Sequence, residues 1–332
     1  MQYYFKKILI IIGVSIIILE NNTTVLYAQQ SCVPFSKIKE QINSLKEKWI
    51  ETDSIEKIVQ QYNVVEKCFL TKDTYNTIMK WAKDSSAKVR FAGYIITKEL
   101  VDTSGLKLFI FSNAAIDENY TIRSWVLFNN LTNDLLWEKA DLKNKFLLNN
   151  LKILFNKFPT EIPFGTIRII GKYQITQLKQ ELINLSNSNK NEKYDHSYFW
   201  SNRWLSLMAL GRMNDKNAIK KMIINLNKST DKFGFFETLA WVYTFVPDKD
   251  IRSFFIDIAL SDKSLERMDP IDRDDKIGPT FLEYTIASVL RGNISNFPSE
   301  EVYNITDETK RIAFIRNWIK ENKNTIILNK GN

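Results

Sequence analysis

Apolar residues recur along most of the chain at the three- and four-residue spacing of amphipathic helices. Ile38, Ile42 and Leu45 lie on one such face, and a second stripe begins at Ile55. Asp53, with Glu56 three residues later, is placed to cap this second helix as a capping box. The same spacing recurs at residues 89–100, 147–158, 239–246 and 251–259. The pattern predicts an all-α protein.

The connections between these stripes are short. Only residues 247–250 separate the last two stripes, where Pro247 stops one helix and one of the two aspartates, Asp248 or Asp250, caps the next. Helices joined so closely lie antiparallel, as a hairpin. Residues 107–111 are the most strand-like stretch, but nothing nearby offers them a pairing strand, so we predict a buried helix there.

One hairpin carries a recognisable arrangement of residues. Arg203 stands eight residues before Gly211, and Asp215 opens the following helix. The unit from Arg203 to Ile223 resembles the HEAT-repeat (armadillo-like) family, and Arg90 and Arg123 hold equivalent places in two partial matches. The resemblance implies a right-handed α-solenoid of stacked antiparallel hairpins. The physical reason is independent of the family, since amphipathic hairpins bury their apolar faces only by stacking.

The N-terminal segment has the features of a secretory signal peptide. Lys6 and Lys7 precede an apolar run over residues 8–19, and a small residue, Ala28, follows. The run is shorter than the roughly 20 residues that span a bilayer. We therefore expect residues 1–28 to be a signal peptide and the mature protein to be periplasmic or extracellular, without a membrane span. An uncleaved N-terminal anchor is the alternative.

The rest of the chain divides into two predicted parts. Residues 29–72 form an N-terminal helical pair, and residues 73–332 form the repeat array. An amphipathic stretch around Ile315 is expected to be a helix that caps its end.

Composition agrees with a helical globular protein. The chain has 44% hydrophobic and 25% charged residues, and only 10 Gly and 7 Pro in 332 residues, fewer than hairpin-rich β folds require. The net charge is +8, with basic residues spread along the predicted helices rather than gathered in one block. Together with export, this spread argues against a nucleic-acid partner.

Two cysteines, Cys32 and Cys68, follow the predicted cleavage point. In an oxidising compartment an even count favours one disulfide, here closing a loop of 36 residues. Two buried free thiols are the alternative. Two cysteines and a single histidine exclude thiolate clusters and zinc sites with several histidines, so we expect neither metal nor cofactor. The carboxylates of residues 269–275 resemble a calcium loop only weakly, and a solvated loop is the simpler interpretation.

Two groups of residues are candidates for binding. Tyr194, His196, Tyr198 and Trp200 form the densest aromatic patch. This patch is either a binding or catalytic surface or the packed start of a helix. Trp137 and Trp200 are the two tryptophans expected to be exposed. By helical phase, the second helices of two hairpins present a further set, which comprises Lys220, Lys221, Asn225 and Arg252.

These observations favour an exported, non-enzymatic scaffold that binds a protein partner or an extended polymer on its concave face. The alternative is a polysaccharide-cleaving enzyme with an α/α toroid fold, in which His196 and a nearby Tyr carry the proton transfers. The overall architecture distinguishes the two hypotheses, since the scaffold requires an open array and the enzyme a closed toroid.

The signal peptide is directly testable. N-terminal sequencing of the protein recovered after export should begin at Gln29, because cleavage is expected after Ala28. Recovered protein that begins at Met1 would contradict cleavage and support the anchor.

Overall fold

The computed structural model describes residues 33–45, 50–62, 68–102, 104–188, 201–228, 232–267, 278–294, 296–324 and 326. These residues form helices, with two isolated bridges, Phe69 with Val101 and Arg267 with Thr280, as their only β pairing. The prediction of an all-α protein is confirmed. The chain divides into two compact units, residues 1–151 and 152–332.

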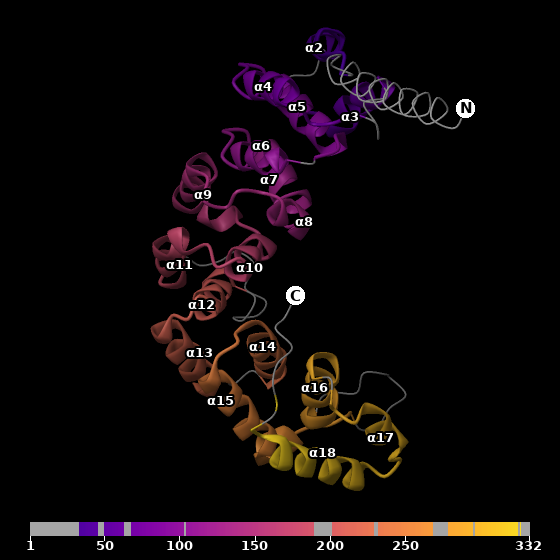
Figure 1. The fold of residues 1–332 in the computed structure, drawn as a ribbon, viewed down its shortest axis with the longest axis vertical. Coiled ribbons are helices and arrows are strands. Elements are labelled where there is room, and N and C mark those ends of the chain that lie inside the picture. Colours follow the sequence, from indigo (N-terminus) through magenta and orange to yellow (C-terminus); the bar gives the residue numbers. More distant parts are fainter. Residues whose placement is uncertain are drawn as a thin grey trace, which may run out of the picture. The chain divides into compact units, whose positions relative to one another are not determined.

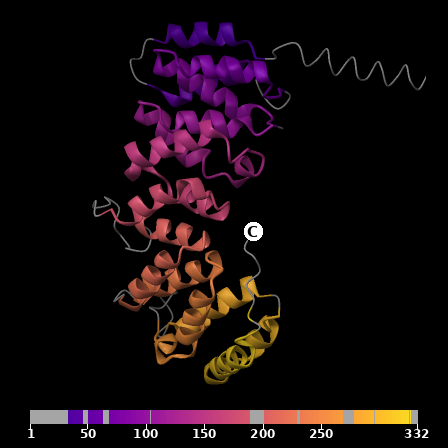
Figure 2. The ribbon, with the colours of Figure 1, turned by 60° about the vertical axis from the view of Figure 1, so that its left-hand side comes forward.

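The first unit holds helices that follow one another in chain order (Figures 1 and 2). They are α2 (Phe35–Ser44), α3 (Thr52–Gln61), α4 (Lys72–Trp81), α5 (Ala87–Glu99), α6 (Leu106–Ala114), α7 (Tyr120–Asn129) and α8 (Asp134–Glu138), and α9 (Lys145–Lys157) begins in this unit.

Helix α5 is the centre of this unit. Its residues from Phe91 to Thr97 are all buried, so it has almost no solvent-facing side. Helices α2, α3, α4 and α6 pack against it and supply the enclosure. Thr97, the polar residue within this buried run, donates its hydroxyl to the carbonyl of Gly93 at 2.8 Å. The hydrophobic burial of α5 therefore holds four other helices in place.

The second unit contains the hairpins that the sequence predicted most clearly. Its helices are α10 (Phe164–Lys172), α11 (Lys179–Ser186), α12 (Asn202–Arg212), α13 (Lys216–Lys228), α14 (Lys232–Phe245), α15 (Lys249–Leu260), α16 (Ala287–Asn293), α17 (Ser299–Asn304) and α18 (Glu308–Asn322), with the short helices η1 (Pro159–Glu161), η2 (Thr176–Leu178), η4 (Asp262–Leu265) and η5 (Leu282–Ile286).

Helix α12 is the central buried helix of the second unit, as α5 is of the first. Every residue from Trp204 to Gly211 is buried, and α10, α11, α13 and α14 pack around it. The two hairpins α12–α13 and α14–α15 lie side by side, since α12 contacts α14 and α13 contacts α15. Like helices thus pack on like helices, with α13 and α15 to the left of α14 in Figure 1.

The C-terminal part of this unit packs against the α14–α15 hairpin. Helix α18 packs on α15, and Ile315 and Ile319 of α18 are buried. Beyond it, Ile326 is 1% exposed, and its carbonyl accepts a hydrogen bond from Arg252 Nη1 at 3.3 Å. Two segments that are far apart along the chain are thereby joined.

Several local predictions can be compared with the structure. Residues 107–111 lie in α6, a helix with Leu108, Ile110 and Phe111 buried, which confirms the predicted buried helix. An aspartate of the 247–250 connection caps α15, as predicted, and the structure shows that it is Asp248, which accepts a hydrogen bond from the backbone N–H of Asp250 at 2.8 Å.

Two predictions were wrong. Asp53 does not cap α3, because the N-cap is Glu51, two residues earlier, and the helix begins at Thr52. Asp53 lies in the first turn, where the helix dipole favours a carboxylate. Trp137 is 1% exposed rather than on the surface. Its indole N–H donates to the carbonyl of Leu131 at 3.1 Å, so burial leaves its polar atom with a partner.

Some predictions lie outside the described residues. They include the signal peptide, the aromatic patch at residues 194–200, the acidic loop at residues 269–275 and the Cys32 side of the disulfide. Cys68 is described and is 5% exposed, beside the bridge between Phe69 and Val101. The Cys32–Cys68 pairing therefore stays a prediction.

The approach of α10 to α12 gives a test of this packing. A Cβ added at Gly171 would lie 2.8 Å from the Cα of Ala209, a backbone atom that cannot move aside cheaply. We expect Gly171→Ala to lower the free energy of unfolding by about 1–3 kcal/mol, measured by urea denaturation.

Gly93→Ala is the matched control, also within a helix. Its added Cβ meets its nearest neighbour at 3.5 Å, an ordinary contact, so the gain in helix propensity should leave stability unchanged or raised by up to about 1 kcal/mol. Equal effects of the two substitutions would contradict the close approach of α10 and α12.

Candidate functional site

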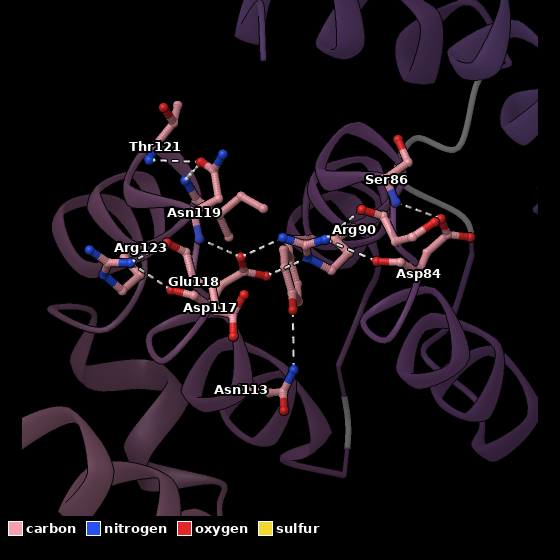
Figure 3. Close-up of polar contacts among 12 residues, drawn as sticks. Asp84, Ser86, Arg90, Asn113, Asp117, Glu118, Asn119, Thr121 and Arg123 are labelled. Carbon is pink, nitrogen blue, oxygen red and sulfur yellow. Dashed lines mark hydrogen bonds and ion pairs between the residues drawn. The ribbon is translucent and has the colours of Figure 1, made fainter. Parts of the chain in front are cut away.

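The most extensive polar arrangement joins the turns at the ends of successive helices in the first unit (Figure 3). Arg90, on α5, donates from Nε and Nη2 to the two carboxylate oxygens of Asp117 at 2.8 and 2.9 Å. The two side chains are 15% and 4% exposed. Arg90 Nη1 also donates to the carbonyl of Asp84 at 2.9 Å. One guanidinium thus links the turn before α5 to the turn before α7.

The arrangement repeats at the next arginine of the same kind, Arg123. Its Nη1 donates to the carbonyls of Asp117 and Glu118 at 2.7 and 2.8 Å, six and five residues before it. Arg90 Nη1 reaches carbonyls at the same two offsets, those of Asp84 and Ser85.

The aspartates of these two turns also behave alike. Each accepts, through Oδ1, a hydrogen bond from the backbone N–H two residues later. Each also pairs with a basic side chain from an earlier helix. For Asp117 that side chain is Arg90, and for Asp84 it is Lys39, at 2.7 Å. The turn before α5 and the turn before α7 therefore share two features, an aspartate that accepts a backbone N–H and a basic side chain from an earlier helix that pairs with it.

In the second unit, ion pairs join α11 to the turn before α13 and α13 to the turn before α15. Lys179 pairs with Asp215 at 2.9 Å, and Lys216 pairs with Asp248 at 2.5 Å. Both aspartates also cap the helix that follows them, through the backbone N–H groups of Ala218 and Asp250. The two aspartates are 33 residues apart along the chain, the same spacing as Arg90 and Arg123 in the first unit.

The electrostatics of these aspartates follow from their partners. The hydrogen bond from Lys39 is the main cause of the lowered pKa of Asp84. Burial acts to raise the pKa of Asp215 and of Asp248, but the hydrogen bonds from Lys179 and Lys216, with the capping N–H groups, outweigh it and lower both. The hydrogen bond to Asp117 in turn raises the pKa of Arg90. The carboxylates of Asp84, Asp215 and Asp248 are therefore held ionised and hydrogen-bonded, which suits a structural link rather than proton transfer.

The predicted binding residues of the second unit fall in two environments. Lys220 and Lys221 are exposed on α13, and Lys221 Nζ donates to Asn187 Oδ1 at 2.9 Å. Asn225, on the same helix, is half-buried. Arg252, on α15, is half-buried and donates to the Ile326 carbonyl, so it holds the chain's later segment instead of lying free beside the lysines. The aromatic candidates Tyr194, His196, Tyr198 and Trp200 lie outside the described residues.

The exposed amides of α11 are the part of this surface that the sequence did not indicate. Gln180 and Asn184 are exposed on α11, and Asn187, exposed at its C-terminal end, accepts the hydrogen bond from Lys221 of α13. The sequence pattern could show that these amides face outward on their helix. It could not show that Asn187 lies near α13, because that depends on how the two helices pack.

Two other kinds of site are absent from the part of the chain that the structure describes. Within the described ranges, no group of three or more His, Cys, Asp or Glu side chains is arranged to hold a metal ion. None of the helices described is both long and apolar enough to cross a bilayer. Comparison with protein-family models, with curated proteins and with solved structures finds no match to this chain.

The link between Arg90 and Asp117 should contribute measurably to stability. Asp117→Asn removes the charge that compensates a largely buried guanidinium, so we expect the free energy of unfolding to fall by about 2–4 kcal/mol. Glu118→Gln is the matched control, since it removes the same charge from the adjacent, exposed residue and should change stability by less than about 0.5 kcal/mol. Chemical denaturation of both variants checks this, and an Asp117→Asn variant as stable as the control would contradict the role of the link.

The lowered pKa of Asp248 predicts a contribution to acid stability. Its folded-state pKa lies below the unfolded value near 3.8, so the carboxylate stabilises the fold above that value. This contribution is lost as the pH falls through the folded-state pKa. Asp248→Asn should therefore lower the melting temperature at pH 6 and show a shallower further decrease between about pH 5 and pH 3.

Asp257→Asn, which removes an exposed carboxylate from the helix that Asp248 caps, is the control. Its melting temperature should follow that of the unsubstituted protein across this pH range. Parallel pH curves for all three proteins would show that the Lys216–Asp248 pair carries no pH-dependent stability.

Proposed function

We propose that this protein is an exported, non-enzymatic helical-repeat scaffold that binds another protein or an extended polymer. The observation that carries the proposal is the repeated link at the turns. Arg90 and Arg123 reach backbone carbonyls at identical offsets, in the turn before α5 and in the turn before α7. A repeat at the level of individual hydrogen bonds supports a fold built from one kind of module, as the resemblance to HEAT repeats implies.

The packing of the second unit supports a stack of hairpins. In an α-solenoid each hairpin lies on the next, first helix against first helix and second against second. The contacts of α12 with α14 and of α13 with α15 have this form. We propose that the stacking continues as a right-handed solenoid.

Such a fold is suited to recognition. Each module contacts only its neighbours, so the exposed side of every helix is left to side chains that need not serve the core. Stacked second helices place these side chains in parallel rows, which matches an extended ligand or a large partner surface. We propose that the row containing Lys220 and Lys221 is the binding face.

Small-angle X-ray scattering of the mature protein tests the open array. A compact chain of this length has a radius of gyration of about 20 Å, and a closed toroid lies near that value. We expect a clearly larger radius, because an open stack is elongated. A radius that matches the compact chain would contradict the open array.

The enzyme alternative is tested in parallel. Purified protein and a His196→Ala variant are incubated with acidic and neutral polysaccharides, and new reducing ends are measured. We expect no release by either protein. Release by the unsubstituted protein that is lost in His196→Ala would replace the scaffold with the polysaccharide-cleaving enzyme.

A further inference from the structure

The positive charge of this protein is concentrated, contrary to the even distribution expected from the sequence. Residues 152–228 contain 13 Lys and Arg against 5 Asp and Glu, a net +8, which equals the net +8 of all 332 residues. The remainder of the chain is therefore neutral overall. All of this excess lies in the second unit.

Helix α13 exposes the largest share of these charges. Lys216, Lys220 and Lys228 lie on one side of the helix, at intervals of four and eight residues, and Lys221 lies beside them. Lys216 is paired with Asp248, but Lys220 and Lys228 form no ion pair with a described residue. Ile224 is the only large apolar side chain exposed on this helix.

Helix α11 continues this surface with amides. Its link to α13 is fixed by two contacts, Lys179 with Asp215 and Lys221 with Asn187, both at 2.9 Å. The only carboxylate within α11 or α13, that of Glu181, is half-buried. We name the exposed residues of this surface the lysine–amide face: Gln180, Asn184, Asn187, Asn217, Lys220, Lys221, Asn227 and Lys228.

We propose that the lysine–amide face binds an acidic polysaccharide, a proposal that rests on the scaffold function above. Ammonium groups pair with carboxylates, and amides both donate to and accept from the hydroxyl groups of sugars. Lys220 and Lys228 are about 12 Å apart along the helix axis, at roughly 1.5 Å per residue. A chain with regularly spaced carboxylates can therefore contact both lysines at once.

The composition of the face favours this occupant over two others. Protein interfaces are enriched in aromatic residues and Arg at their centres and depleted in Lys, whereas this face has Lys and amides around a single Ile. Single-stranded nucleic acids are bound with stacking aromatic residues, and duplex bases are read by the Arg fork; α11 and α13 contain neither Arg nor an aromatic residue.

The test uses the mature full-length protein and three probes: polygalacturonate, neutral dextran and a short DNA duplex. Titration calorimetry at low and moderate salt measures the affinity for each. We expect binding to polygalacturonate that weakens as salt rises, weaker binding to DNA, and none to dextran. No binding to polygalacturonate, or tighter binding to DNA, would overturn the proposal.

Charge reversal locates the binding face. The double variant K220E/K228E should bind polygalacturonate at least about tenfold more weakly, since one exposed charge pair contributes about 2- to 5-fold and reversal adds repulsion. The control K310E/K320E changes the net charge by the same amount on exposed positions of α18 and should lose less than about threefold. Circular dichroism confirms that both variants fold.

Equal losses in the two variants would overturn the assignment to this face, since net charge alone would then explain binding. Release of a protein partner by K220E/K228E, without any affinity for polygalacturonate, would replace the polysaccharide with a protein. In both cases an elongated scattering profile would leave the scaffold function standing, so the two proposals fail separately.

Discussion

Each unit of this protein is organised around a helix that has almost no surface for water. In α5 and in α12, seven or more consecutive residues are buried. A helix turns through about 100° per residue, so a buried run of that length faces every direction and must be covered on all sides. Four neighbouring helices provide that cover in each unit. Because α5 and α12 form the buried centre of each unit, the helices around them can bury only one side and expose a polar side to water.

The polar links solve a separate problem, which is the geometry of the turns. Helix ends leave backbone carbonyls without partners, and a guanidinium can satisfy two of them while also pairing with a carboxylate. Arg90 does both, and Arg123 repeats the contact with the carbonyls. In the second unit, Asp215 and Asp248 in addition cap the helix that follows each of them. Hydrophobic burial brings the helices together, and these links fix where one ends and the next begins.

Much of the fold was predictable because it depends on local pattern. The apolar stripes placed the helices, and the short connection at Pro247 and Asp248 predicted the α14–α15 hairpin. The cap of α3 and the burial of Trp137 were predicted wrongly. A two-residue difference in where a helix begins decides the cap, and the contact of Trp137 with Leu131 depends on a turn that the pattern does not specify.

The candidate surface was predictable only in part. Helical phase showed that Lys220 and Lys221 face outward. It could not show that Asn187 lies within hydrogen-bonding distance of Lys221, or that Arg252 is engaged by Ile326, 74 positions further along the chain. Both contacts require tertiary packing. The concentration of charge in residues 152–228 was present in the sequence, but the whole-chain average concealed it.

The contact between Arg252 and Ile326 has a consequence for biosynthesis. The helices that cover α5 are its near neighbours along the chain, so that core can assemble as soon as they have been synthesised. The surface of helix α15, in contrast, is completed only when α18 and Ile326 have been synthesised. During synthesis the apolar surface of α15 in the second unit therefore stays exposed for longer than that of α5 in the first unit. A chaperone is expected to bind there.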